Sequence, residues 1–153
     1  MCAEDFGFPE TWQGEVATRT CWNGEEQERA CADLGGTLVA DIYDAFDDVP
    51  KMRTPLPAKH VTFEPDSRLR AILGREVCKV NSLHHQGLME AHRAPSLMTT
   101  AYGVVDGLVE ALESPHHRFV VALQCHPERA NELPEQFQRL FAALVYQAAN
   151  PKS

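Results

Sequence analysis

The sequence predicts an α/β fold, because short strand-like runs alternate with helical segments along its 153 residues. Residues 119–123 form a continuous apolar run, which is typical of a strand buried on both faces of a sheet. Apolar side chains recur at helical spacing over residues 133–148, and Asn131 is the predicted cap of this helix. Ser67 and Gly74 bracket another segment as the cap and the stop of a short helix.

The other elements follow from local composition in chain order. Residues 24–34 favour a helix that ends at the glycine pair 35–36, and residues 37–42 predict a short extended segment. Residues 43–58 are acidic and then rich in proline, which predicts a surface loop. Four further strands are predicted over residues 60–63, 77–80, 97–101 and 108–112.

The overall composition narrows the class of protein. The formal net charge of −8 argues against a nucleic-acid partner or an acidic membrane surface. No apolar run approaches the roughly 20 residues that cross a bilayer, and the acidic first residues do not resemble a secretory signal. The five cysteines are an odd number with wide spacings and no CxxC pair, which predicts reduced thiols and a cytoplasmic location.

Two short stretches carry the chemistry: VNSLHHQ at residues 80–86 and QCHPE at residues 124–128. The second places His126 two residues before Glu128, directly after the apolar run. An imidazole whose tautomer is set by a nearby carboxylate is the base of a nucleophilic triad. The adjacent histidines of the first stretch lack a third ligand at suitable spacing, so we predict no metal site.

Five motifs in order over residues 35–128 resemble the class I glutamine amidotransferase superfamily, and within it the γ-glutamyl-γ-aminobutyrate hydrolase branch, also called peptidase family C26. The motifs are GGTL with Asp41-Ile42, then His60-Val61, then VNSLHHQ, then DGLVEA at residues 106–111, and finally QCHPE. The resemblance implies a flavodoxin-like three-layer sandwich with a mostly parallel sheet that is incomplete at its N-terminal side. Residues 1–23 are then an irregular segment, and residues 24–153 a partial amidotransferase-like domain.

The resemblance also implies a Cys-His-Glu triad, in which Cys21 is the nucleophile, His126 the base and Glu128 the carboxylate that orients it. The implied substrate is a small γ-glutamyl amide, hydrolysed through a glutamyl thioester without a cofactor. The resemblance places the VNSLHHQ loop beside the active site, where it helps to shape the substrate end. Its predicted substrate-binding residues are Asn81, Ser82, His84, His85 and Gln86.

The region around Cys21 departs from the family pattern. The nucleophile elbow needs small neighbours, yet Arg19 and Asn23 stand where the resemblance implies glycines. Only 20 residues precede Cys21, whereas the family places several strands and an oxyanion loop there. Two alternatives therefore stay open: a catalytically inactive, truncated amidotransferase-like binding domain, and a sheet completed by another copy or a partner chain.

Overall fold

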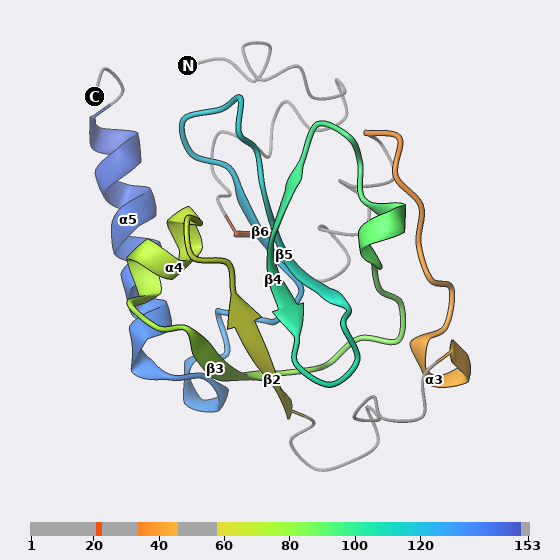
Figure 1. Cartoon of the computed structure of the whole chain (residues 1–153). Coiled ribbons are helices and arrows are strands. Elements are labelled where there is room, and N and C mark those ends of the chain that lie inside the picture. The colour runs from red at the N-terminus through yellow and green to blue at the C-terminus, as the bar shows by residue number, and fades with distance from the viewer. Residues whose placement is uncertain (1–20, 23–33, 46–57, 151–153) are drawn as a thin grey trace.

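A six-stranded sheet forms the centre of the molecule in the computed structural model, which describes residues 21–22, 34–45 and 58–150. The strand order is β1-β6-β5-β4-β2-β3 (Figure 1). The strands are β1 Cys21–Trp22, β2 Ala58–Phe63, β3 Val77–Asn81, β4 Met98–Gly103, β5 Val109–Glu113 and β6 Val121–Leu123.

The α/β class is confirmed, but the prediction of a mostly parallel sheet is wrong for the described residues. Only β1 and β6 pair in parallel there, and every other neighbouring pair is antiparallel. The physical reason lies in the connections, because a parallel pair needs a crossover of about a dozen residues or more. A tight turn at Asp106 and Gly107 joins β4 to β5, and Gly107 adopts φ 67° there. Such a turn joins only antiparallel strands.

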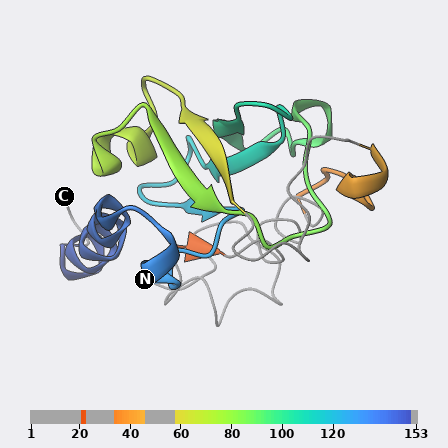
Figure 2. The same cartoon turned by 90° about the horizontal axis from the view of Figure 1, so that it is seen from below.

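Two helices cover one side of the sheet (Figures 1 and 2). The first, α4 (Arg68–Leu73), begins and ends as its sequence predicts. The Ser67 side chain accepts a hydrogen bond from the backbone N–H of Arg70, and Gly74 ends the helix in the left-handed conformation at φ 65°. A distant residue completes the cap, because the buried carboxylate of Glu113 accepts from the backbone N–H groups of Arg68 and Leu69.

The second helix, α5 (Gln138–Ala149), begins later than predicted. Two 3₁₀ turns, η4 (Ala130–Glu132) and η5 (Glu135–Phe137), precede it. Pro134 separates these turns and disfavours the helical conformation at Leu133, which is extended at φ −123° and ψ 155°, so the chain does not form one continuous helix from Asn131. The prediction that Asn131 caps the helix is therefore wrong, and Phe137 occupies that position.

The main core fills the space between these helices and the sheet. Leu69, Leu73, Phe137 and Leu140 of the helical layer pack there against apolar side chains from β2 to β6. A second cluster of apolar side chains lies on the other side of the sheet and includes Val109, Leu112 and Ala122. Side chains of β5 and β6 thus pack into both cores, which explains why both strands are buried throughout.

The remaining segments lie on the side of the sheet away from α4 and α5 (Figure 1). They are α3 (Ile42–Ala45), η3 (Glu90–His92) and the connections around them. Val39 forms an isolated bridge with Gly87, and the backbone N–H of Ile42 donates to the carbonyl of His85. These bonds attach the 34–45 segment to the loop that follows β3.

Several predictions fall outside the described residues. The predicted helix over residues 24–34 and most of the predicted loop over residues 43–58 lie there. The strands predicted over residues 60–63, 77–80, 97–101, 108–112 and 119–123 are confirmed, and their ends shift by at most two residues. Among the described residues, no helix is long and apolar enough to cross a membrane.

Candidate active site

His126 and Glu128 form the contact that the sequence predicts. The buried strand β6 ends at Leu123, and the chain then turns outward through Pro127. The His126 Nδ1 atom lies 2.7 Å from the Glu128 Oε1 atom. The imidazole is about one quarter exposed, at 26%, and the Glu128 side chain is more exposed, at 57%. The carboxylate therefore favours the tautomer with a proton on Nδ1, which leaves the Nε2 atom to accept a proton.

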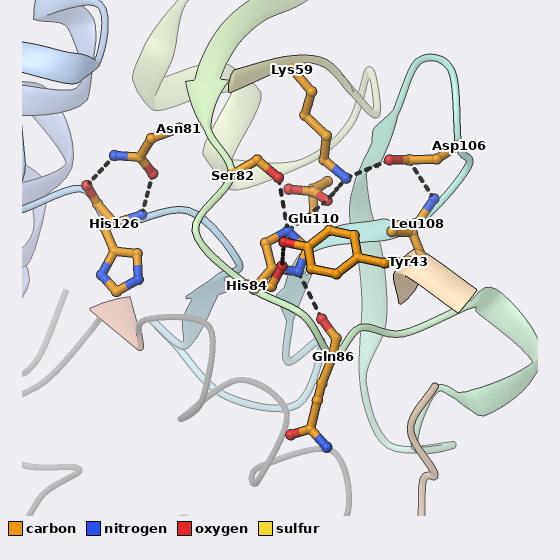
Figure 3. A network of polar contacts seen from close by, with 10 residues as sticks. All are labelled: Tyr43, Lys59, Asn81, Ser82, His84, Gln86, Asp106, Leu108, Glu110 and His126. Atoms are coloured by element: carbon orange, nitrogen blue, oxygen red, sulfur yellow. Dashed lines mark hydrogen bonds and ion pairs between the residues drawn. The ribbon is translucent and has the colours of Figure 1, made fainter. Parts of the chain in front are cut away.

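Asn81, the last residue of β3, contacts the backbone of His126 rather than its ring (Figure 3). The backbone N–H of His126 donates to Asn81 Oδ1 at 2.8 Å, and Asn81 Nδ2 donates to the carbonyl oxygen of His126 at 3.2 Å. Asn81 is 3% exposed. The two stretches identified in the sequence thus meet in the structure at this side chain.

The rest of the VNSLHHQ loop divides into buried and exposed residues. His84 is buried: its Nδ1 atom lies 2.7 Å from the Gln86 carbonyl oxygen, and its Nε2 atom lies 3.3 Å from the Ser82 hydroxyl. The Tyr43 hydroxyl donates to the His84 carbonyl at 2.8 Å. His85 is exposed, and the Gln86 side chain points away from this network (Figure 3). Of the predicted substrate-binding residues, only His85, which is exposed, and Gln86, which is half-buried, are therefore accessible to a ligand.

A cluster of buried charges lies beneath this loop. The Lys59 ammonium is 2.8 Å from Asp106 Oδ2 and also forms an ion pair with Glu110 Oε1. All three side chains are at most 7% exposed. Glu110 Oε1 lies 4.0 Å from the His84 Nε2 atom, so the cluster reaches the loop. One ammonium group faces two carboxylates, so the cluster carries an excess negative charge in a buried environment whenever both carboxylates are ionised.

Burial shifts the proton affinities in this cluster. Burial, and then the nearby charge of Lys59, lowers the pKa of His84 to about 4. Burial raises the pKa of Glu110 to about 7, although the Lys59 ammonium acts in the opposite direction. Burial alone would lower the pKa of Lys59, but the carboxylates of Glu110 and Asp106 together raise it. His84 is therefore neutral near pH 7 and donates its Nδ1 proton to Gln86, which suits a structural role in the loop.

These shifts make opposite contributions to stability as the pH changes. The unfolded chain protonates His84 below about pH 6.5, whereas the folded protein does so only near pH 4. His84 therefore costs stability as the pH falls from 6.5 to 4. Glu110 keeps its proton in the folded protein up to about pH 7, but releases it near pH 4.5 in the unfolded chain. Its contribution is present below pH 4.5 and is lost as the pH rises to 7.

We expect Glu110→Gln and His84→Asn to change the pH dependence of stability in opposite directions. Without Glu110, the free energy of unfolding will gain a positive slope relative to wild type, up to about 1.4 kcal/mol per pH unit between pH 4.5 and 6.5. Without His84, the relative slope will be negative over the same range. Urea unfolding at half-unit steps of pH measures both slopes, with Glu135→Gln at an exposed position as the control. Curves parallel to the wild-type curve for both variants would contradict these two titrations.

The structure describes the backbone of Cys21 but not its side chain. Cys21 lies in β1 and pairs in register with Val121 of β6. The role of Cys21 as the nucleophile therefore stays a prediction.

Lys59, Glu110 and Tyr43 are site residues that the sequence does not single out, and the sequence predicts only a turn at Asp106. The sequence carries a signal for two of these four residues, Asp106 and Glu110, because both belong to the DGLVEA motif. A carboxylate in the middle of an apolar strand indicates a buried partner, since unpaired charges are rarely buried. Among the described residues, no group of three or more His, Cys, Asp or Glu side chains is arranged to hold a metal ion.

Comparison with known proteins agrees with the motifs. The model of the Peptidase C26 family matches residues 27–128, which are 102 of the 153 residues. A glutamine amidotransferase-like protein of Rickettsia prowazekii is 39% identical over 66 residues, or 43% of this chain and 22% of the relative. A Mycobacterium tuberculosis protein provisionally named glutamine amidotransferase is 40% identical over 80 residues, or 52% of this chain and 23% of the relative.

The fold has a counterpart among solved structures. A Thermoplasma acidophilum protein provisionally named as one subunit of GMP synthase superposes with a TM-score of 0.67 over 91% of this chain and 63% of that chain. At 11% identity this likeness concerns the fold alone. The matched stretches span less than a quarter of each curated relative. The family match nevertheless extends over two thirds of this sequence and ends at Glu128, so the chain belongs to the Peptidase C26 family of glutamine amidotransferase-like proteins.

Proposed function

We propose that the chain is a glutamine-amidotransferase-type hydrolase that cleaves γ-glutamyl amides. The observation that carries the proposal is the 2.7 Å contact between His126 and Glu128, at the end of a buried strand in a chain of this family. An imidazole in this position can take the proton of a thiol and return it to a leaving amine. Cys21 is the proposed source of the thiol.

The proposed reaction has two steps. The Cys21 sulfur attacks the γ-carbonyl carbon, the carbon–nitrogen bond breaks, and the amine leaves with the proton that His126 took from the thiol. A glutamyl thioester remains. Water then loses a proton to His126 and adds to the thioester carbon, and the carbon–sulfur bond breaks to release the acid and the thiol. Glu128 stabilises the imidazolium in both steps.

Hydrolysis of γ-glutamyl-p-nitroanilide by the purified chain tests the proposal. We expect release of p-nitroaniline by the wild type, and its complete loss in Cys21→Ala, because a methyl group cannot form the thioester. Cys31→Ala is the matched control and should retain the activity. Turnover by Cys21→Ala at the wild-type rate would show that another group is the nucleophile.

One observation favours a second candidate function, a catalytically inactive amidotransferase-like binding domain. Cys21 is in register with Val121, which precedes His126 by five residues (126 − 121) on the parallel neighbouring strand. Five extended residues span up to about 16 Å, a wide offset for a nucleophile and its base. Absence of hydrolysis, together with retained binding of a γ-glutamyl amide by calorimetry, would support this function. Activity that appears only after another chain is added would instead indicate a sheet completed by a partner.

A further inference from the structure

The Asn81 side chain occupies the place of a neighbouring strand beside His126. The hydrogen-bonded ladder between β5 and β6 reaches Leu123, so His126 lies beyond the last ladder pair. There, the carboxamide of Asn81 bonds both the N–H and the carbonyl oxygen of the same residue, at 2.8 and 3.2 Å. Paired bonds of this kind are what an adjacent strand supplies within a sheet.

This contact joins two strands that are not neighbours. In the sheet order, β5, β4 and β2 separate β6 from β3, the strand that ends with Asn81. The contact therefore forms only because the sheet curves until the end of β3 meets the segment after β6. Val80 and Leu123, the neighbouring residues on these strands, pack in the same core cluster and hold this curvature.

The orientation of the carboxamide is set by its contacts. Asn81 Nδ2 also donates to Glu132 Oε2 at 3.1 Å, and Glu132 Oε1 pairs with the Arg129 guanidinium at 2.7 Å. The reversed orientation would place the amide NH₂ against the His126 N–H, and the amide oxygen against two other oxygens. Both N–H donors of Asn81 are therefore engaged inside the protein, in a side chain that is only 3% exposed.

We infer that Asn81 is a positioning residue for His126, which acts on the base through its backbone and not on the substrate. The inference rests on the proposed function, because it assigns how the base of that reaction is held. His126 is partly exposed, and the Glu128 carboxylate that orients its ring is more exposed still. The buried Asn81 thus fixes the backbone of His126, and with it the position from which the imidazole extends. The sequence alone predicts substrate binding for Asn81, because it shares a motif with His84 and His85.

Asn81→Ala removes all three hydrogen bonds and tests the inference. We expect backbone amide exchange at His126, followed by NMR, to accelerate about tenfold relative to the amide of Leu112 in the core. We also expect kcat to fall about ten- to a hundredfold with little change in KM, since a base displaced by about 1 Å loses that much. The matched control is Asn131→Ala, at an exposed position beside Glu132, which should change neither quantity.

A second variant tests the two donors of Asn81 separately from its acceptor. Asn81→Asp has the same shape and retains an acceptor for the His126 N–H, but it loses both donors and sets an oxygen against the His126 carbonyl and the Glu132 carboxylate. We expect kcat to fall in this variant too, with exchange at His126 accelerated less than in Asn81→Ala. Unchanged exchange at His126 in Asn81→Ala would overturn the inference, as would a raised KM with unchanged kcat. If the wild type does not hydrolyse γ-glutamyl amides, the exchange experiment still decides the inference, because it does not depend on turnover.

Discussion

Replacement of His126 by Ala will lower kcat/KM for γ-glutamyl-p-nitroanilide by at least about a thousandfold. His126 follows β6 closely in the chain, and the Glu128 carboxylate lies 2.7 Å from its Nδ1 atom. Among the residues that the structure describes, this imidazole is the candidate base. In the proposed reaction, no positioned base would then take the thiol proton, and no acid would protonate the leaving amine. Glu128→Gln should cost less, because its exposed carboxylate can be replaced in part by water at the imidazole.

The control for this experiment is His116→Ala. His116 is exposed in the turn between β5 and β6, at the opposite end of β6 from His126. The His116→Ala variant should keep wild-type kinetics. Activity that survives in His126→Ala but is lost in Cys21→Ala would mean that a different group serves as the base. A wild-type chain without activity would instead favour the binding domain.

The parts of the fold that were predicted correctly depend on short-range signals. Ser67 and Gly74 lie at the two ends of α4 and act on backbone groups within four residues, so composition alone locates that helix. The start of α5 was missed because the apolar spacing continues across Pro134. Proline is tolerated in a first helical turn, so a periodic pattern does not exclude it. The direction of the strands does not follow from the resemblance, which implies a mostly parallel sheet, whereas the Asp106-Gly107 turn between β4 and β5 joins antiparallel strands.

The candidate site likewise contains one short-range contact that the sequence predicts and long-range contacts that it does not predict. His126 and Glu128 are two residues apart, so their contact can be read from the sequence. Asn81 meets His126 across 45 positions, and only the curvature of the whole sheet brings them together. The ion pair between Lys59 and Glu110 likewise joins β2 and β5, with β4 between them. Contacts of this range depend on strand order and register, which local patterns do not specify.

Replacement of Lys59 by Met will destabilise the protein by about 3–5 kcal/mol near pH 7. The loss is expected to be large because Asp106 and Glu110 would remain buried without the positive charge they share. A typical domain of this size is stable by only about 5–15 kcal/mol, so the variant will unfold at much lower urea concentrations. Lys79→Met on the adjacent strand is the matched control and should change stability by less than about 0.5 kcal/mol, since Lys79 is exposed.

Combining Lys59→Met with Glu110→Gln tests whether charge, and not packing, causes the loss. Glu110→Gln removes one of the two carboxylates that Lys59 compensates, so the double variant should be more stable than the sum of the two single changes predicts. The deficit of the single Lys59→Met variant relative to wild type should also grow as the pH rises above 7, because Glu110 releases its proton there in the wild type, whereas loss of the ammonium makes the variant hold it. A deficit that is independent of pH, and equal in the presence and absence of Glu110, would show that Lys59 stabilises the fold through its aliphatic chain alone. If the shared ammonium is what allows the two carboxylates to be buried beneath the His84 loop, the stability deficit of Lys59→Met will depend both on pH and on the presence of Glu110.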